Sequence, residues 1–423
     1  MVTNADRART LGLRVVGSSA SNRAMEAEVR RLARRLGLAV PAPVRPSDGT
    51  LLYPFDPLLA ATLVDYARTP SRILWEVATL ESRRLEAMYS ELGELLVTNP
   101  PEWLEDRLGI SVRVGPLRDP FAGPLQLRGT VKNAVIDAAR TLGLDVRLEP
   151  EDPDATLFVG ELQNGQLLVA LDLAGRGQHE RGYRLSRTEA PVRETLAAQA
   201  PVLARWHPKH EVLLDPMAGS GTFAIEAACL ALGRPLWVPP KRPASLDLVP
   251  FRNLRRSRTD LFADSSPSIF ASDRDPRAHR STIENSRRAG VDHLITNIRA
   301  DVRGLDASSL QEERAKLRTD PVDLTRGLIV ANPPYGPRLG EDEAAVGAAH
   351  VALAELWRRM GDGWRALVLS GYDGTERAFG ARPRMRRPVR VAKLKAHLYL
   401  FDTERSREPR RAGSTPVGRA RSP

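Results

Sequence analysis

The segment from Val212 to Glu226 constrains the fold more than any other part of the 423-residue chain. It begins with an apolar run, passes Asp215, turns at Gly219 and Gly221, and continues as an apolar helical pattern. Glycine lacks a Cβ, so the backbone can bend sharply there and approach a ligand closely, while the first amides of the helix face that ligand. This order of strand, glycine turn and helix predicts a nucleotide-binding unit of a Rossmann-like α/β fold.

The spacing of the glycines excludes two other nucleotide-binding loops. The segment lacks the Gly-x-Gly-x-x-Gly fingerprint of dinucleotide enzymes and the Gly-x-x-x-x-Gly-Lys-Ser/Thr loop that holds phosphates. An acid at the strand end would repel a pyrophosphate and attract a ligand that carries an ammonium and a sulfonium group. We therefore predict S-adenosylmethionine as the cofactor, bound by a loop that comprises Asp215, Pro216, Ala218, Gly219, Gly221 and Thr222.

Two further acidic residues complete the predicted cofactor site. Asp273 ends the apolar run Ile269 to Ser272, and an acid at the end of a second strand can accept hydrogen bonds from both ribose hydroxyls. Asp275 precedes Pro276, an arrangement that favours a helix cap rather than a ligand. Asp301 follows a shorter apolar pattern, and we predict that it accepts a hydrogen bond from the adenine amino group.

The candidate catalytic residues come directly after another buried strand pattern, in the sequence Asn332-Pro333-Pro334-Tyr335-Gly336. The prolines fix the backbone and remove amide donors, so carbonyl oxygens and the Asn332 side chain are left to accept hydrogen bonds from a substrate amine. An amino group on a nucleobase is a poor nucleophile, so the enzyme has to hold its hydrogens and aim its lone pair at the methyl group. Tyr335 offers a flat face on which the base can stack. We assign the methyl-transfer site to Asn332, Pro333, Pro334 and Tyr335.

The length of the chain and its patterns predict more than one domain. Strand and helix patterns alternate from about residue 190, which predicts a mostly parallel, doubly wound sheet in a domain over 186–403. The preceding half mixes short strands and helices and is predicted to form two α+β units, 1–95 and 96–185, with a hairpin at Asn164-Gly165. Residues 404–423 are rich in Arg, Pro, Gly and Ser and are predicted to form a disordered basic tail.

Composition limits the kinds of binding partner and the cellular compartment that we expect for this protein. A formal net charge of +11 predicts attraction to a polyanion, and nucleic acids and membrane surfaces both qualify. No apolar run reaches the roughly 20 residues of a membrane-spanning helix, and residues 1–10 lack the apolar core of a secretory signal, so we expect a cytoplasmic protein outside the membrane. The single cysteine, Cys229, can form neither an internal disulfide nor a cysteine-rich zinc site, and we predict no metal.

The three motifs, taken in order, resemble those of the S-adenosylmethionine-dependent methyltransferases that modify amino groups and carry an Asn-Pro-Pro-Tyr sequence. Segments before them are similar to the THUMP-domain RNA guanine-N2 methyltransferases, particularly those that act on large-subunit rRNA. These segments are Val131-Lys-Asn-Ala-Val-Ile-Asp137, Leu171-Asp-Leu-Ala-Gly175, His179-Glu-Arg181-Gly-Tyr183-Arg184 and Ala190-Pro-Val-Arg-Glu194.

The resemblance implies a ferredoxin-like unit and a THUMP domain that hold RNA while the Rossmann-like domain methylates guanine N2. Residues 233–268 resemble a long insertion that the family carries between its cofactor loop and its ribose-binding acid. The chain departs from the family at Ala218, where relatives often have cysteine, and in the first fifty or so residues, which follow the family loosely. Carried over by motif, the cofactor residues are Asp215, Gly219, Gly221 and Asp273, and guanine is held by Asn332 to Tyr335.

We therefore predict methylation of guanine N2 in large-subunit rRNA, a substrate that the THUMP-like half, the segment Arg181 to Arg184 and the motif at Asn332 favour. The same reaction on tRNA stays open, because the motifs specify the chemistry and not the shape of the RNA. A DNA adenine-N6 methyltransferase would use the motif at Asn332 equally well. The alternative from another class is an RNA-binding protein that has lost turnover. The sequence leaves the oligomeric state open.

Overall fold

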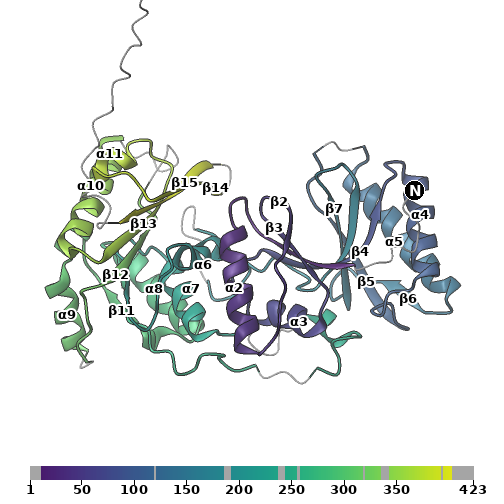
Figure 1. Cartoon of the computed structure of the whole chain (residues 1–423), viewed down its shortest axis with the longest axis horizontal. Helices are drawn as coiled ribbons and strands as arrows, with labels where there is room; N and C mark the ends of the chain where they lie inside the picture. The colour runs from purple at the N-terminus through teal and green to yellow at the C-terminus, as the bar shows by residue number, and fades with distance from the viewer. Residues whose placement is uncertain are drawn as a thin grey trace, which may run out of the picture.

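The computed structural model describes residues 11–118, 121–184, 192–236, 243–254, 258–317, 320–334, 343–391 and 394–402. Within these ranges the chain forms two units, each built on one sheet, that lie side by side with helix α2 (Asn22–Arg35) between them (Figure 1). The predicted tail, 404–423, and the candidate catalytic residue Tyr335 lie outside the described residues. No helix in the described ranges has the length and apolar character needed to span a bilayer.

The first unit is an eight-stranded mixed sheet in the order β2-β3-β1-β4-β8-β7-β5-β6, in which only β5 runs parallel to its two neighbours. The hairpin predicted at Asn164-Gly165 is confirmed, since Gly165 has a φ of +85° between the paired strands β7 and β8. The strands are β1 (Gly12–Val16), β2 (Val44–Ser47), β3 (Thr50–Pro54), β4 (Arg72–Leu80), β5 (Leu108–Val114), β6 (Val146–Leu148), β7 (Ala155–Glu161) and β8 (Leu167–Asp172).

Pairing between β4 and β8 makes this sheet continuous across the two α+β units expected over 1–95 and 96–185, and the boundary between them stays a prediction. Local sequence explains where the helices begin: the Asp56 carboxylate accepts a hydrogen bond from the Leu59 amide at 2.7 Å, and Pro57 occupies the first turn. The helices that pack on the sheet are α2, α3 (Pro57–Tyr66), α4 (Leu85–Thr98) and α5 (Pro124–Thr141).

The second unit confirms the predicted doubly wound sheet. Its strands are β9 (Val212–Asp215), β10 (Ile269–Ser272), β11 (Ile295–Ile298), β12 (Gly327–Ala331), β13 (Trp364–Ser370), β14 (Met385–Val391) and β15 (Leu394–Asp402). They lie in the order β11-β10-β9-β12-β13-β15-β14, parallel except for β15 and β14 at one edge. The inner strands β9, β10 and β12 are buried on both faces, which is why their sequences are continuous apolar runs rather than alternating ones.

Helices cover both faces of this sheet. Leu213 points into a core formed with α6 (Glu194–Leu203) and α7 (Thr222–Leu232), and α8 (Pro276–Arg288) packs beside α7. The neighbouring residues Val212 and Leu214 point into the opposite core, formed with α9 (Ala307–Lys316), α10 (Glu343–Met360) and α11 (Thr375–Phe379).

The segment between α7 and β10 ties the second unit to the first. Its residues Leu246 and Phe251 are fully buried in the core of the first unit, where the Phe251 ring lies edge-on to Phe55 and Trp75, 6.1 Å from each ring centre. The Leu236 amide also donates to the Asp65 carbonyl at 2.7 Å. The described part of the insertion at 233–268 therefore has a structural role, which its sequence did not reveal.

Candidate active site

Three neighbouring strands bring most of the predicted site residues to one edge of the second sheet. β10 and β12 flank β9, both parallel to it, and the register places Asp215 beside Ala271. Asp273 and Asn332 follow the carboxyl ends of β10 and β12. The strand order reverses between β9 and β12, which is where open α/β sheets bind ligands.

The two glycines of the loop after β9 serve different needs. Both have positive φ, +57° at Gly219 and +80° at Gly221, a conformation that side chains with a Cβ rarely adopt. A Cβ at Gly221 would lie 2.8 Å from Cγ2 of Thr282, whereas a Cβ at Gly219 would meet nothing within 4 Å. Gly221 therefore lets α8 approach the loop, and the open space at Gly219 leaves room for a ligand.

Two polar residues of α8 hold the loop in place, and the sequence analysis assigned neither of them a role. The Thr282 hydroxyl donates to the Gly219 carbonyl at 3.1 Å, and the Asn285 amide donates to the Ser220 carbonyl at 2.9 Å. Both side chains are buried, although the helix is mostly polar and Ser286 is its one other buried residue. The signal in the sequence was a pair of polar residues three positions apart on one face of the helix. Only the fold shows that they bind the cofactor loop.

Asp273 connects the second strand to the same loop. Its carboxylate accepts hydrogen bonds from the Gly219 amide and the Asp275 amide, both at 2.9 Å. Each oxygen retains a lone pair, so both can still accept a ribose hydroxyl. The interpretation of Asp275 as a cap is confirmed, because its carboxylate accepts from the Arg277 amide at 2.8 Å at the start of α8.

Two of the predicted site residues have a buried oxygen atom that lacks a hydrogen-bond partner among the described residues. One is Oδ2 of Asp215, whose side chain is 1% exposed, and the other is Oδ1 of Asn332. Buried polar atoms are nearly always satisfied in folded proteins, so each such atom needs an explanation. A ligand that brings an ammonium group to Asp215 and an amine to Asn332 would supply both missing donors, and these residues therefore fit S-adenosylmethionine and a base amine.

Other predicted site residues lie at the same edge with part of their hydrogen-bonding capacity already used. The Asp301 carboxylate accepts from the Arg303 amide at 3.0 Å and pairs with Arg274 at 3.6 Å. The Thr222 hydroxyl accepts from the Arg184 guanidinium at 2.8 Å. Pro216 is buried and Ala218 half-buried. Their roles toward the cofactor stay predictions, as do those of Pro333 and Pro334.

Across the described ranges, no three His, Cys, Asp or Glu side chains form a metal-binding group.

Burial raises the pKa of the Asp215 carboxyl well above its ordinary value of 3.8, and the nearby Asp273 adds to the effect. An acid whose pKa is higher in the folded chain binds more protons there, so the protein without cofactor loses stability as the pH rises from 3.8 to the raised pKa. We expect Asp215→Asn to raise the free energy of unfolding at neutral pH and to flatten this pH dependence. It should also weaken cofactor binding by about 10- to 100-fold, because a charged hydrogen bond is lost.

Unfolding of Asp215→Asn followed from pH 4 to 8, with and without S-adenosylmethionine, checks this prediction. Asp275→Asn is the control, because Asp275 caps a helix and should leave cofactor affinity unchanged. Equal destabilisation of Asp215→Asn at every pH would contradict the account.

A fully buried ion cluster lies one turn into α7, beside the cofactor loop. Glu226 is 0% exposed, and its carboxylate accepts hydrogen bonds from Arg68 at 3.0 Å and from the Tyr183 hydroxyl at 3.1 Å. Arg181 lies 3.5 Å from the same carboxylate and donates to the Arg68 carbonyl at 2.7 Å. Arg68 comes from the first unit, so the cluster joins both units and the segment between them.

The segment from Arg181 to Arg184, which the family resemblance singled out, has a structural role. The side chain of Arg181 is 3% exposed, and Tyr183 is also buried. Arg184 pairs with Glu194 at 3.4 Å and binds the Thr222 hydroxyl at the start of α7. These side chains hold the methyl-transfer domain in position, and their charges are not available to phosphates. Cys229 is buried in α7, where it packs in the apolar core.

The cofactor loop, Asp273 and the motif at Asn332 are shared with a known protein family. Residues 181–399 match the model of the RMKL-like methyltransferase domain. The chain belongs to this family. The match starts at Arg181 and includes the glycine turn, Asp273 and the motif that begins at Asn332. The family predicted from those motifs is thereby confirmed.

Individual relatives extend over both units. The chain is 32% identical over 339 residues to the ribosomal RNA large subunit methyltransferase K/L of Cellvibrio japonicus, a match that covers 75% of this chain and 42% of that protein. It is 26% identical to the putative RNA methyltransferase YpsC of Bacillus subtilis, over 89% of this chain and 93% of the relative. The chain thus spans less than half the length of the K/L relative.

Solved structures show the same fold. SMU.472, a putative methyltransferase complexed with SAH, matches with a TM-score of 0.71 at 23% identity, over 93% of this chain and 98% of that chain. The likeness includes both units, and it confirms the predicted α/β fold of the second unit together with its α+β companion.

Proposed function

We propose that this protein transfers a methyl group from S-adenosylmethionine to the N2 amino group of guanine in large-subunit rRNA. The observation that carries the proposal is the pair of buried acceptors without partners, Asp215 Oδ2 and Asn332 Oδ1, beside a glycine turn with open space. The family match supports methyl transfer, and the names of the K/L relatives and YpsC support an RNA substrate. A ribosomal substrate would place the protein in the cytoplasm.

In this proposal S-adenosylmethionine supplies an activated methyl group on its sulfonium sulfur. Asp215 faces the methionine ammonium, and Asp273 accepts from the ribose hydroxyls while its link to the Gly219 amide keeps the loop closed around the ligand. Asn332 accepts a hydrogen bond from the guanine amine and orients the nitrogen lone pair. Because an amide oxygen is a weak base, the contribution of Asn332 is orientation, which can account for a large part of the rate.

The units expected at 1–95 and 96–185 are assigned in the same proposal to the ferredoxin-like and THUMP modules that hold RNA. Three alternatives remain and differ in substrate or activity: guanine-N2 methylation of tRNA, adenine-N6 methylation of DNA, and RNA binding without turnover. The resemblance of the first unit to RNA-binding modules favours RNA over DNA. No observation on the described residues favours tRNA over rRNA.

Asp273→Ala should weaken S-adenosylmethionine binding by about 10- to 100-fold, because it removes charged hydrogen bonds to the ribose and releases the Gly219 amide. Isothermal titration with the cofactor alone checks this. Asp292→Ala, which changes an exposed acid outside the site, is the matched control and should bind normally. Unchanged affinity in Asp273→Ala would remove Asp273 from the cofactor site.

The test of the substrate is methyl transfer from labelled S-adenosylmethionine to three unmodified polymers, offered separately: large-subunit rRNA, tRNA and duplex DNA. Label in the rRNA alone is the expected result. Label in tRNA alone would support the proposed reaction but change the assigned substrate to tRNA. Label in DNA alone would overturn the assignment of an RNA substrate. A protein that binds RNA but does not bind the cofactor would support the non-catalytic alternative.

A further inference from the structure

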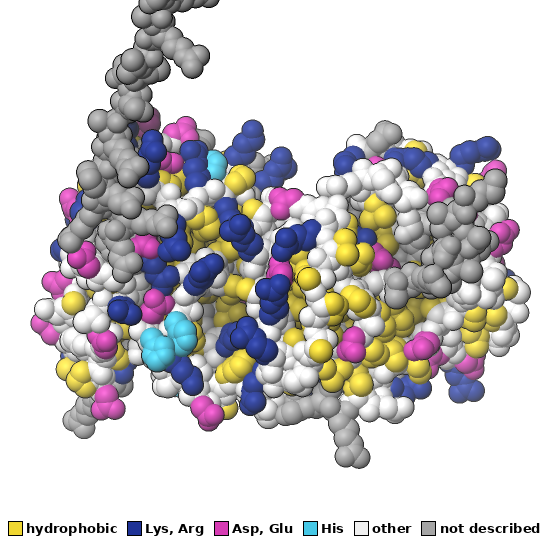
Figure 2. All heavy atoms as spheres, viewed as in Figure 1, with side chains coloured by type: hydrophobic (Ala, Val, Ile, Leu, Met, Phe, Trp, Pro, Cys, Tyr) yellow, Lys and Arg dark blue, Asp and Glu magenta, His cyan; other side chains and the backbone are white. Residues whose placement is uncertain are grey.

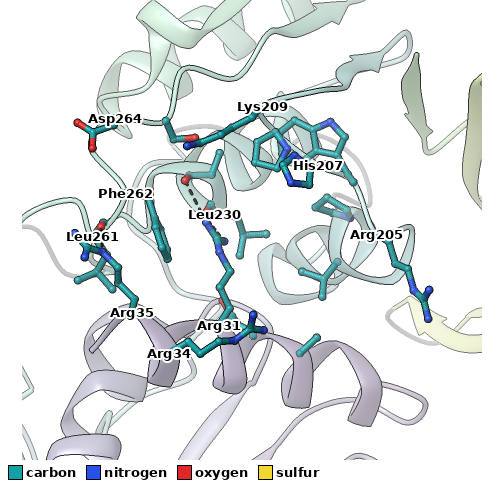
Figure 3. A pocket seen from close by; sticks show the side chains of 18 residues that line it. Arg31, Arg34, Arg35, Arg205, His207, Lys209, Leu230, Leu261, Phe262 and Asp264 are labelled. Carbon is teal, nitrogen blue, oxygen red and sulfur yellow. Dashed lines mark hydrogen bonds between the residues drawn. The ribbon is translucent and has the colours of Figure 1, made fainter. Parts of the chain in front are cut away.

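A groove with a volume of about 840 Å³ lies between the two units, away from the candidate active site. Figure 3 shows its walls: Arg31, Arg34 and Arg35 come from α2, and Arg205, His207 and Lys209 come from the segment between α6 and β9. The end of α7 and the residues before β10 close the remaining side. These segments precede β9 and β10, so the groove lies at the amino ends of the strands, and the active site lies at the carboxyl ends.

Two of the cations build the groove. The Arg31 guanidinium donates to the carbonyls of Leu230 and Ala231 at 2.7 and 3.2 Å and lies 4.1 Å from the centre of the Phe262 ring. Arg35 donates to the Leu261 carbonyl at 2.7 Å. Both arginines use their donors to attach α2 of the first unit to the second unit.

Three other cations have no such structural use. Arg34, Arg205 and Lys209 are exposed, and none of them forms an ion pair with an acid in the described part of the chain. Two acids line the groove, Glu28 and Asp264. The Glu28 carboxylate is buried and accepts hydrogen bonds from the Arg68 and Thr69 amides, both at 2.8 Å, so Asp264 is the exposed acid among the groove-lining residues.

The arrangement of these cations fits a chain of phosphates better than a single small anion. Figure 3 shows Arg205 and Lys209 extending in different directions from one segment, while Arg34 lies on the opposite wall. A hollow of about 600 Å³ adjoins the groove and shares Pro208 and Lys209 with it, and its lining includes Arg326 together with the acids Glu211 and Asp323. Figure 2 shows dark-blue Lys and Arg side chains spread across the middle of this face, where the two units meet.

Aromatic surfaces accompany the positive charge. The rings of His207 and His210 stack on each other 4.5 Å apart, and both residues are exposed. Trp206 is half-buried in the groove wall. Cations that follow a phosphate backbone, combined with flat rings on which unpaired bases can stack, are typical of RNA-binding surfaces.

We infer that this groove binds the sugar–phosphate backbone of the RNA substrate, as a second contact apart from the methyl-transfer site. The inference rests on the proposed function, because it takes RNA as the polyanion. β9 and β10 have four residues each, so at about 3.3 Å per residue the two ends of the strands are roughly 13 Å apart. One folded RNA can therefore occupy the groove and present a guanine at the opposite edge of the sheet.

The test is the affinity for a labelled stem–loop RNA as a function of KCl concentration, with the full chain and without cofactor. The combined variant Arg34→Gln, Arg205→Gln, Lys209→Gln should bind about tenfold more weakly at low salt, and the slope of log K against log salt should become shallower by about 2 to 3. A charge-preserving variant, Arg34→Lys, Arg205→Lys, Lys209→Arg, should keep the wild-type slope.

A second control neutralises three exposed arginines outside the groove, in the variant Arg280→Gln, Arg287→Gln, Arg377→Gln. An equal fall in slope for this control and the groove variant would show a diffuse charge effect and overturn the inference, as would an unchanged slope in the groove variant. Ultraviolet crosslinks between RNA and the peptide that contains residues 205–210 are expected in the wild type. Crosslinks confined to other peptides would also contradict it.

Two further measurements separate this inference from other outcomes. If the groove variant loses binding to phosphatidylserine vesicles while its RNA binding is unchanged, the groove binds a membrane surface and the RNA inference fails. Titration of S-adenosylmethionine into the same proteins tests the proposed function separately: no binding in the wild type would refute that function, whereas normal binding with an unchanged RNA slope in the groove variant would refute the groove alone.

Discussion

Asn332→Ala should lower the rate of methyl transfer by about 100- to 1000-fold while the affinity for S-adenosylmethionine stays within twofold of the wild type, a range set by the loss of one orienting group. Oδ1 of Asn332 is buried and lacks a partner among the described residues, so it is free to accept from the substrate amine. Removing it leaves the amine free to rotate and its lone pair away from the methyl group. Single-turnover rates with saturating RNA, together with cofactor titration, measure the two effects separately.

Asn332→Asp is the matched comparison for this prediction. It keeps the acceptor oxygen and nearly the same volume, so it should retain more activity than the alanine variant. Cofactor affinity that falls as far as turnover in Asn332→Ala would place Asn332 in the cofactor site instead. Full activity in Asn332→Ala would remove it from the methyl-transfer site.

Glu226→Ala should destabilise the protein by about 3 to 5 kcal/mol, the usual effect of removing one partner from a buried ion pair. The change leaves the guanidinium groups of Arg68 and Arg181 buried without the carboxylate that neutralises them and removes the acceptor of the Tyr183 hydroxyl. The predicted change is a lower urea midpoint, monitored by tryptophan fluorescence. Glu226→Gln should also be destabilised, because an amide removes the charge and replaces one of the two acceptor oxygens with an NH2 group that cannot accept from Arg68 or Tyr183.

An exposed pair offers the control for the Glu226 prediction. Glu313 pairs with Lys316 at 2.5 Å on the surface of α9, where solvent screens the interaction, so Glu313→Ala should leave the urea midpoint unchanged. A Glu226→Ala variant as stable as the Glu313→Ala variant would show that the cluster contributes nothing to the junction between the units.

Cofactor affinity should also respond to Glu226→Ala, although Glu226 does not line the site. Glu226 lies five residues after Gly221 in α7, and Arg184 binds Thr222 in the first turn of the same helix. The buried cluster therefore fixes the first unit, the connecting segment and the cofactor loop relative to one another. These contacts are a physical explanation for the family motif at Arg181 to Arg184.

Local sequence was sufficient to predict the elements of the site. The apolar runs before Asp215, Asp273 and Asn332 are strands buried on both faces, as continuous apolar sequence indicates. The glycine turn has the positive φ angles expected at Gly219 and Gly221. In each of these cases the sequence pattern and the structural element that it predicts are formed by residues adjacent in the chain.

Contacts between distant residues were not predictable from the sequence in the same way. Arg68 and Glu226 are 158 positions apart, and nothing in either local pattern indicates the other. The burial of Arg181 and Arg184 was not predictable either, because charged side chains are seldom buried without a partner and their partners were not visible in the sequence. The groove beside Arg34 and Arg205 also depends on how the two units pack. The net charge could therefore indicate a polyanionic partner but not the surface that binds it.

The atom that receives the methyl group tests the central claim most directly. Large-subunit rRNA treated with the wild-type protein and S-adenosylmethionine is digested to nucleosides, and the methylated product is identified by mass spectrometry, with Asn332→Ala in parallel. The account predicts N2-methylguanosine from the wild type and almost none from the variant. Methylation at a ring nitrogen, a ring carbon or a ribose hydroxyl would contradict it, because the buried acceptor at Asn332 would then have no amine to hold.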